Sequence, residues 1–428
     1  MAEVKREFDV LVVGAGPAGM AAACAATDCS ASVGIVDDNQ SPGGQIWRGE
    51  AGAPSTPEAA TLYNKFSDAK IPFMNAAVFA QAEPGMLLAE SGETVYELRY
   101  GKLILATGAR ERFLPFPGWT LPNVVGAGGL QALVKSGLPI ASQRVVVAGS
   151  GPLLFAVGAY LKKQGAHVLC IAEQAGRAQL ARFVAGLWRF PGKAAQALRL
   201  RGELGGVPYL LNCWPVAAKG AEKLKSVTLQ QGEKRWDVPC DYLACGFHLT
   251  PNTELAELIG CEVQEGCVRV NQRQETSVPD VLCAGEPTGI GGAELALVEG
   301  EIAGYVAGRR ETEAEMRFGE RRKLRRFARL LEQTFRLRAE LKGMAQAETI
   351  VCRCEDVPLG RLRGHTSWRA AKLETRCGMG PCQGRVCGPA VEFLLGWKAE
   401  SVRPPVFPVR VAALAASKDS GGQGAMQG

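Results

Sequence analysis

Histidines, long apolar runs and catalytic side-chain sets are scarce in this sequence of 428 residues. The three histidines, His167, His248 and His365, belong to no Ser/His/Asp set, and no close pair of carboxylates has a clear catalytic role. No run of about 18 apolar residues predicts a membrane span, and no signal-peptide pattern opens the chain. Hydrolysis by a triad or by paired carboxylates therefore finds no support, and the sequence names no catalytic residue.

The charge balance and the cysteines indicate which partners and which cellular compartment to expect. The net charge of +6 is too small to suggest a nucleic-acid partner. Fourteen cysteines without a single C-x-x-C pair are typical of a reducing compartment, where thiols stay free or bind metal. We therefore expect a cytoplasmic protein with no nucleic-acid partner and no transmembrane segment. Peripheral association with a membrane surface stays open.

Glycine is abundant instead, and its first cluster belongs to a dinucleotide-binding pattern. The apolar run FDVLVV leads into Gly14, Gly16 and Gly19, which are spaced as G-x-G-x-x-G and precede an alanine-rich helical stretch. A second apolar run ends at Asp37. Gly14 would make the tight turn, Gly16 would admit a pyrophosphate, Gly19 would allow close helix packing, and Asp37 would hold the ribose hydroxyls. A ligand-free glycine turn is disfavoured, because strand, helix and acid are all in register.

The pattern recurs in residues 143–173. The strand RVVVAG leads to Gly149 and Gly151, and Glu173 is the acidic residue, but Leu154 stands where the third glycine belongs. Two interpretations stay open for this second site. It binds NAD(H) or another adenine nucleotide, or it is a βαβ scaffold that has lost its ligand.

Three further segments, SPGGQIW, KLILATGAR and VLCAGEPTG, complete a resemblance to the two-dinucleotide-binding-domain flavoproteins over residues 8–308. In that family the glycine pair approaches the flavin, the ATG strand closes over the flavin nucleotide, and a late Gly-Asp reaches the ribityl chain. The resemblance implies FAD at the first site. It assigns these further cofactor-binding residues: Gly43, Gly44, Gln45, Ala106, Thr107, Gly108, Gly285 and Glu286. Glu286 replaces the family's aspartate, and the lack of paired redox cysteines argues against disulfide reduction.

Residues 317–343 carry many arginines on what the spacing of apolar residues predicts to be an amphipathic helix. Such a helix could contact nucleic acid or a membrane surface. Glutamates interrupt the charge, which favours a connecting helix packed on a domain or on a partner subunit.

Five cysteines cluster near the end of the chain: Cys352, Cys354, Cys377, Cys382 and Cys387. Structural cysteines have no reason to cluster, so a metal or redox site is indicated. Zinc knuckles use wider spacings than C-x-C, whereas iron–sulfur clusters accept mixed spacings, and a redox disulfide is a third alternative. Gly388-Pro389 predicts a helix N-terminus beside Cys387. Arg353, Arg376 and Arg385 could offset the negative charge of a cluster.

The motifs CRCEDV and TRCGMGPCQGRVC resemble the [2Fe–2S] domain of the bacterioferritin-associated-ferredoxin (BFD) type, and with it the resemblance spans almost the whole chain. That domain is fused to flavoproteins of multisubunit amino-acid and amine dehydrogenases, which include hydrogen cyanide synthase, D-hydroxyproline dehydrogenase, proline dehydrogenase and opine oxidase. The resemblance maps the metal ligands to Cys352, Cys354, Cys382 and Cys387, and does not require Cys377. It also implies a catalytic flavoprotein (beta-type) partner, a small ferredoxin-like subunit and an FMN between subunits. Some members of the family hold NAD or ATP where FAD is placed here, and a second nucleotide, NAD or ATP, is the expectation for the second site.

The predicted fold class is α/β, a two-dinucleotide-binding-domain flavoprotein with Rossmann-like sheets and a small helical C-terminal BFD-like domain. The second nucleotide domain is expected as an insertion in the first. The expected divisions are 1–108 with 281–315 for FAD, 109–280 for the second nucleotide, 316–346 for the linker helix, 347–400 for the [2Fe–2S] domain and 401–428 for the tail. Residues 417–428 of that tail are expected to be disordered.

The predicted function follows from the cofactors. A flavin takes two electrons as hydride and a [2Fe–2S] cluster takes one at a time. We expect an FAD-dependent oxidoreductase subunit that acts on CH–NH or CH–NH2 donors and passes electrons from a partner flavoprotein subunit to an acceptor. D-hydroxyproline is the leading substrate, and glycine, proline and opines are the others. A stand-alone NAD(P)H-dependent flavin oxidoreductase is the alternative.

Overall fold

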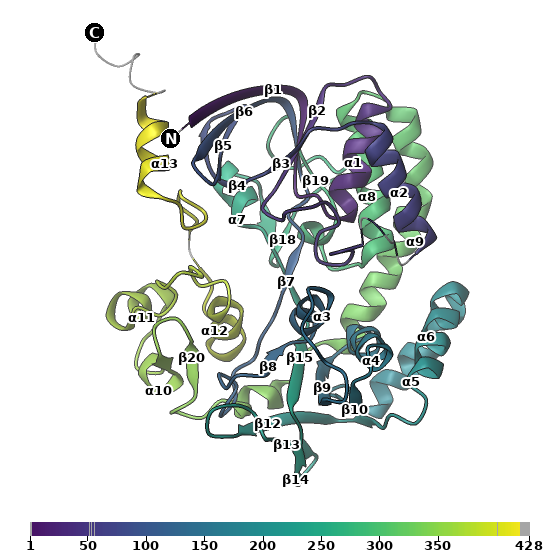
Figure 1. Cartoon of the computed structure of the whole chain (residues 1–428), viewed down its shortest axis with the longest axis vertical. Helices are drawn as coiled ribbons and strands as arrows, with labels where there is room; N and C mark the ends of the chain where they lie inside the picture. The colour runs from purple at the N-terminus through teal and green to yellow at the C-terminus, as the bar shows by residue number, and fades with distance from the viewer. Residues whose placement is uncertain (1, 51, 53, 55, 400, 420–428) are drawn as a thin grey trace. The chain divides into compact units, whose positions relative to one another are not determined.

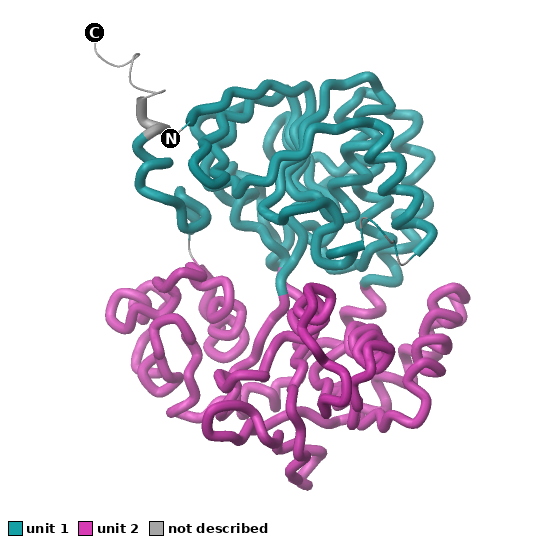
Figure 2. The backbone as a smooth tube through the Cα atoms, viewed as in Figure 1, with its two compact units in different colours: residues 1–110, 251–328, 401–428 teal, residues 111–250, 329–400 magenta. Residues whose placement is uncertain are grey.

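The computed structural model describes residues 2–50, 52, 54, 56–399 and 401–419 (Figure 1). They form two compact units, and the chain contributes separate segments to each (Figure 2). Unit 1 comprises residues 1–110, 251–328 and 401–428, and unit 2 comprises residues 111–250 and 329–400. The fold is therefore a mixed α/β arrangement in which one unit is inserted in the other.

Unit 1 is built on a mainly parallel sheet of spatial order β3-β2-β1-β6-β5-β4, with β19 beside β6. Val13 lies opposite Val36 and Leu105, and Leu105 lies opposite Cys283, so the carboxyl ends of β2, β1, β6 and β19 meet at one edge. The strands are β1 (Ala2–Val13), β2 (Val33–Asp37), β3 (Phe73–Asn75), β4 (Ala77–Glu83), β5 (Met86–Ser91), β6 (Thr94–Leu105) and β19 (Val281–Cys283). This edge is where ligands bind in open parallel sheets.

Small residues allow helices α1 (Pro17–Thr27) and α8 (Ala293–Ala307) of unit 1 to pack closely beside each other (Figure 1). A Cβ on Gly300 would lie 2.1 Å from the Ala18 carbonyl oxygen, and one on Gly304 would lie 2.2 Å from that of Ala22. The alanine-rich helix is buried for this reason. The helices of the unit are α1 (Pro17–Thr27), α2 (Pro57–Asp68), α7 (Glu254–Ile259), α8 (Ala293–Ala307) and α13 (Val411–Asp419), with the 3-10 turn Glu286–Thr288.

Residues 251–280 belong to unit 1, whereas the sequence analysis assigned them to the second nucleotide domain. The reason lies in the core, since Leu255, Ile259 and Val268 are buried with Leu103 of β6. The short strands β17 (Val263–Gln264) and β18 (Cys267–Val268) pair in this segment.

The C-terminal segment also packs on unit 1. Val409 and Leu414 pack against a buried cluster of Phe79, Ala80 and Leu88, and Arg410 Nε donates to Glu90 Oε1 at 2.6 Å. Residues 417–419 of the expected disordered tail lie within α13, and residues 420–428 lie outside the described residues.

Unit 2 contains a second parallel sheet, of order β11-β10-β9-β15-β8, and an antiparallel group β12-β13-β14. Its strands are β8 (Val124–Gly126), β9 (Arg144–Ser150), β10 (His167–Glu173), β11 (Tyr209–Leu211), β12 (Cys213–Lys219), β13 (Ser226–Gln231), β14 (Lys234–Pro239) and β15 (Tyr242–Phe247). Its helices up to residue 250 are α3 (Ala127–Lys135), α4 (Leu153–Lys163), α5 (Arg177–Gly186) and α6 (Pro191–Glu203), with the 3-10 turn Leu187–Arg189. The pair β7 (Ala109–Glu111) and β16 (Leu249–Pro251) lies where the chain passes from one unit to the other.

The amphipathic helix expected over 317–343 corresponds to α9 (Glu311–Phe335), which crosses the unit boundary after Ala328 and ends before the expected limit. Phe327 and Phe335 of its apolar stripe are buried. The cysteine region follows a 3-10 turn at Ala339–Met344 and consists of β20 (Ile350–Cys352), β21 (Val357–Pro358), α10 (Leu359–Leu362), α11 (Trp368–Thr375) and α12 (Cys387–Leu395).

Among the described residues, every helix is too short or too polar to cross a bilayer.

Candidate functional site

The first glycine turn follows β1 at the carboxyl edge of the unit 1 sheet. Gly14 has a φ of +104°, and a Cβ there would lie 2.2 Å from the Ala106 carbonyl oxygen, so this position requires glycine. Gly19 packs against the same turn, because its Cβ would lie 1.7 Å from the Gly14 oxygen. Gly16 caps α1 without a side-chain hydrogen bond, which leaves the first N–H groups of the helix to face an anion. The turn therefore fits a dinucleotide pyrophosphate.

Asp37 ends β2 beside this turn, and its carboxylate is held in place by backbone N–H groups. Its Oδ2 accepts from the Ala15 N–H at 2.5 Å, and its Oδ1 accepts from the Asn39 N–H at 2.7 Å. An acidic side chain fixed at the end of this strand is in the position from which such a residue binds the ribose hydroxyls of a dinucleotide.

The predicted glycine pair also lies against the first turn. The Gly43 N–H donates to the Ala15 oxygen at 2.8 Å, and a Cβ on Gly44, where φ is +59°, would lie 2.8 Å from Gly16 Cα. Gln45 follows them and is exposed. Gly43 and Gly44 thus lie against the same turn as the fingerprint glycines.

The ATG segment continues β6 at the same edge. The Ala106 N–H donates to the Val13 oxygen at 2.8 Å. Thr107 Oγ1 donates to the Asn252 oxygen at 2.7 Å, and the Asn252 N–H donates to the Gly108 oxygen at 3.0 Å. Asn252 therefore fixes the turn after β6, a role that local sequence patterns did not reveal.

Glu286 follows Gly285 after β19, and its carboxylate holds the N-terminus of α8. It accepts from the Gly292 N–H at 2.9 Å and from the Gly291 N–H at 3.3 Å. Burial raises the pKa of Glu286 to about 7, although these two hydrogen bonds act against the shift. Its contact with a flavin ribityl chain stays a prediction.

Glu299, which the sequence analysis did not single out, supports this loop from within α8. Its carboxylate is fully buried. Oε1 accepts from Arg325 Nε at 2.7 Å and from Arg321 Nε at 3.3 Å, whereas Oε2 accepts from Thr288 Oγ1 at 2.9 Å and from the Gly285 N–H at 3.2 Å. The sequence does contain a signal for this role, since Glu299 lies within a stretch of small apolar residues that is expected to be buried. A buried carboxylate requires a charged or hydrogen-bonding partner.

The second glycine turn has the same local shape in unit 2. Gly149 has a φ of +143°, and its Cβ would lie 2.0 Å from the Gly246 oxygen. Leu154, in place of the third glycine, is fully buried, and a Cβ on Gly246 would lie 3.4 Å from its Cδ2. Leu154 is thus accommodated in the core of unit 2, together with Val147 and Ala244.

Glu173 ends β10 beside this turn and is fully buried. Its Oε2 accepts from the Gly151 N–H at 2.7 Å, and its Oε1 accepts from the Ala175 N–H at 2.8 Å. Burial raises the pKa of Glu173 to about 7. The carboxylate thus engages an amide that a phosphate would otherwise face.

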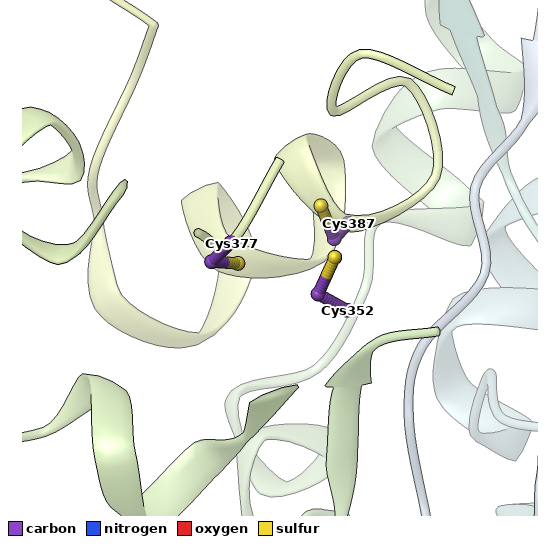
Figure 3. Close-up of side chains that lie close together, drawn as sticks. All are labelled: Cys352, Cys377 and Cys387. Atoms are coloured by element: carbon purple, nitrogen blue, oxygen red, sulfur yellow. The ribbon is translucent and has the colours of Figure 1, made fainter. Parts of the chain in front are cut away.

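Three of the clustered cysteines bring their thiols together (Figure 3). The Sγ atoms of Cys352, Cys377 and Cys387 all lie within 4.8 Å of one another, and all three residues are buried. Cys352 ends β20, Cys377 follows α11, and Cys387 begins α12. The structure therefore groups two predicted ligands with Cys377, which the sequence analysis did not count as a ligand.

The other two predicted ligands, Cys354 and Cys382, are neighbours of each other outside this buried group. A backbone hydrogen bond of Cys382 lowers the pKa of Cys354, but burial and the adjacent Cys382 thiol outweigh it and raise that pKa. Cys354 is exposed and Cys382 is half-buried. The set of four metal ligands stays a prediction.

Glycines in the last motif allow its loops to meet. A Cβ on Gly378, where φ is +80°, would lie 2.7 Å from the Trp368 ring, and one on Gly380 would lie 2.3 Å from Cys354 Cβ. A larger residue at position 380 would push its loop away from that of Cys354, and one at position 378 would displace the Trp368 ring.

The thiol chemistry fits a metal centre. Hydrogen bonds from the Cys377 and Cys387 thiols lower the pKa of Cys352 to about 2, and its Sγ also accepts from the Gly378 N–H at 3.5 Å. The hydrogen bond with Cys352 in turn raises the pKa of Cys377 to about 12. A buried thiolate with adjoining thiols is the donor set of soft metal ions and iron–sulfur clusters. Of the arginines expected to offset cluster charge, Arg376 is paired with Glu355 at 2.7 Å.

Comparison with known proteins agrees with an oxidoreductase fold around the first glycine turn. Residues 8–301 match the family described as pyridine nucleotide-disulphide oxidoreductase. Hydrogen cyanide synthase subunit HcnB of Pseudomonas aeruginosa is 32% identical over 421 residues, which cover 88% of this chain and 90% of the relative. An opine oxidase subunit of Agrobacterium tumefaciens is 29% identical over 478 residues, which cover 95% of this chain and 91% of the relative.

A solved structure, that of L-proline dehydrogenase from P. horikoshii, has the same fold with a TM-score of 0.67 and 18% identity. The match covers 97% of this chain and 80% of that one. The first turn, its acid and the matched residues identify an FAD-binding oxidoreductase domain, and the cysteine group near the C-terminus fits an iron–sulfur domain. The chain belongs to the pyridine nucleotide-disulphide oxidoreductase family and, within it, to the group that includes HcnB and the opine oxidase subunit of Agrobacterium tumefaciens.

Proposed function

We propose that this chain is the electron-transfer subunit, carrying FAD and a [2Fe–2S] cluster, of a heteromeric dehydrogenase or oxidase that acts on the CH–NH or CH–NH2 group of an amino or imino acid. The observation that carries the proposal is that one chain contains an intact dinucleotide turn in unit 1 and, in unit 2, a group of buried thiols that could hold a metal. Relatives named as subunits of hydrogen cyanide synthase and of opine oxidase support it.

The residues divide the work between the two sites. Gly14, Gly16 and the N-terminus of α1 would hold the FAD pyrophosphate, and Asp37 would hold its ribose. Cys352, Cys354, Cys382 and Cys387 are the proposed cluster ligands. FAD would accept two electrons and release them one at a time, and a [2Fe–2S] cluster would carry one, so their combination suits a relay between a two-electron donor and a one-electron acceptor.

The finer assignments extend this proposal. D-hydroxyproline is the leading substrate, with glycine, proline and opines as the others. A partner flavoprotein subunit would oxidise the substrate, an interfacial FMN and a small ferredoxin-like subunit would complete the complex, and the complex would be cytoplasmic. Support comes from the relatives and from the neighbouring L-proline dehydrogenase fold.

Purification from the native host tests the proposal directly. A tag on this chain should recover a second flavoprotein, with iron, acid-labile sulfide and FAD in defined ratios, and the complex should reduce a dye with one of the proposed amino acids. A chain that purifies alone, with flavin but without iron, would refute the proposal. If that lone chain oxidised NADH rapidly with a dye acceptor, the stand-alone flavin oxidoreductase would be the correct assignment.

A further inference from the structure

The carboxyl edge of the unit 2 sheet, where a dinucleotide would lie, is covered by a part of the chain itself. We call residues Phe335–Arg338, which follow α9, the linker segment. Ser150 Oγ, at the end of β9, donates to the Phe335 carbonyl oxygen at 2.9 Å. Gln174, just after β10, donates from Nε2 to the Arg336 oxygen at 3.3 Å and accepts at Oε1 from the Arg338 N–H at 3.3 Å. The linker segment thus bridges the ends of the two strands that flank the second glycine turn.

The aromatic ring of Phe335 lies over this turn. A Cβ on Gly151 would lie 3.7 Å from Phe335 Cγ, and the ring of Phe183 packs edge-on at 5.3 Å between centroids. Phe335 is 5% exposed. In a dinucleotide-binding fold, the second glycine of the turn leaves room for the pyrophosphate, and here the phenyl ring takes that room.

The polar groups around the turn are satisfied within the chain. Gln174 is fully buried, and its Nε2 also donates to Ser150 Oγ at 2.9 Å. The Gly151 N–H, which faces a phosphate in a ligand-binding turn, already donates to Glu173. A dinucleotide would have to replace these hydrogen bonds and to expel a buried phenyl ring.

The linker segment is also the start of an anchored path to the cysteine region. The Arg338 guanidinium lies over the Trp214 ring at 5.3 Å, and Leu341 and Met344 are buried in the same core as Trp214. Trp119 Nε1 then donates to the Ile350 oxygen at 2.6 Å. Ile350 begins β20, which ends in Cys352. The path therefore runs from the second glycine turn to the first cysteine of the buried group.

We propose that the second dinucleotide fold has become a socket for the linker segment, which occupies the place of a dinucleotide and fixes the start of the cysteine region. While the segment is seated, NAD and ATP are excluded from the second turn. The linker segment is the proposed cause of the exclusion, because Leu154, in place of the third glycine, is packed within the core of unit 2. This inference depends on neither the substrate nor the partner subunit proposed above.

Population arithmetic gives the expected size of the effect. A nucleotide that binds only the open turn has an apparent Kd equal to its intrinsic Kd divided by the fraction of molecules in which the turn is open. Removing the phenyl ring raises that fraction. We expect no saturable binding of NAD⁺ to the wild-type protein up to about 1 mM, and at least a roughly tenfold tighter apparent Kd after Phe335→Ala.

The experiment uses the full chain loaded with FAD, so that the first site is filled, and titrates NAD⁺ and ATP by calorimetry. Phe335→Ala and the milder Gln174→Ala are compared with Phe155→Ala. The control removes a similar ring from the same fold, where Phe155 packs on Tyr209 at 4.6 Å. Retention of FAD and the thermal midpoint show that each variant is folded. We expect binding to appear in Phe335→Ala and Gln174→Ala and to stay absent in Phe155→Ala.

Hydrogen exchange measured by mass spectrometry separates the two parts of the proposal. In Phe335→Ala the amides of 335–338 and 350–352 should exchange faster, whereas Phe155→Ala should leave both segments unchanged. Micromolar binding of NAD⁺ to the wild type, with protection of 149–152, would overturn the inference. A Phe335→Ala or Gln174→Ala protein whose linker exchanges freely but which still binds no nucleotide would also overturn it. Unchanged exchange at 350–352 after release of the linker would refute the anchoring role.

Discussion

The buried carboxylate of Glu299 allows a sharp test of what holds the loop beside the first nucleotide site. Glu299→Gln keeps the size of the side chain and removes its charge, which leaves Arg321 and Arg325 without their shared counter-ion. Breaking a buried ion pair by removing one partner costs about 3–5 kcal/mol. The two arginines are 12% and 27% exposed, so water compensates them in part, and we expect a loss near the lower limit, about 3 kcal/mol of unfolding free energy.

Glu301→Gln is the matched control, because Glu301 lies on the same helix and pairs with Arg317 at 2.8 Å at the surface. Both side chains of this pair are half-buried and still reached by water, and such a pair is worth about 1 kcal/mol at most. Urea unfolding should therefore separate the two variants by about 2 kcal/mol or more, and thermal unfolding should place Glu299→Gln roughly 6–12 °C below the wild type.

A local measurement shows whether the loss acts on the loop. Glu299 accepts hydrogen bonds from Thr288 and from the Gly285 N–H, so amide exchange in 285–288 should accelerate in Glu299→Gln, and FAD should dissociate more readily. Equal losses of stability in the two variants would refute the reasoning, since burial would then not distinguish the two ion pairs.

Three further predictions concern the glycine turns and the thiols. Gly14→Ala should abolish the retention of FAD, measured by its absorbance. The control is Gly49→Ala: Gly49 also has a positive φ, but a Cβ there would meet nothing within 4 Å. This control should lose only about 1 kcal/mol of stability and keep the flavin. Cys382→Ser should abolish the visible absorbance of the cluster, and Cys377→Ser should keep it; the reverse result would assign the ligand role to the buried group that contains Cys377. Burial raises the pKa of Glu173 from 4.5 to about 7, so the folded state retains a proton that the unfolded state loses, and stability falls as pH rises through this window. Glu173→Gln removes this pH dependence. In urea unfolding, the stability of this variant relative to the wild type should therefore rise by about 3 kcal/mol between pH 4.5 and pH 7. If the difference in stability between the two proteins were the same at both pH values, Glu173 would not titrate in this range.

Local patterns in the sequence were sufficient for the strands, turns and helices that form the first site. The run FDVLVV, the glycines after it and Asp37 lie within one βαβ unit, where the spacing of residues determines the geometry. The amphipathic helix was predicted for the same reason, because its apolar stripe has the helical period.

Contacts between segments that are distant in the sequence could not be predicted from such local patterns. Cys377 is next to Cys352 because a turn after α11 meets the end of β20, and no spacing rule covers two cysteines that are 25 positions apart. Residues 251–280 belong to unit 1 because their apolar side chains complete its core, which their position in the chain does not reveal. The seating of the linker segment likewise depends on hydrogen bonds between residues more than 160 positions apart.

The two nucleotide folds of this chain differ most in what their acidic residue holds. Glu173 lies opposite Gly149 in the sheet register, and Asp37 ends the corresponding strand one residue after Val36, which lies opposite Val13. From equivalent positions the shorter side chain reaches Ala15, between the two glycines, and the longer one reaches the second glycine, Gly151. One additional methylene thus moves a carboxylate onto the amide that a phosphate requires. In the first turn Asp37 does not accept from the amide of the second glycine, Gly16, so that this N–H can face a ligand. In the second turn the corresponding amide, that of Gly151, donates to Glu173 of the same chain. This difference supports the proposal that the second turn seats the linker segment and does not bind a second cofactor.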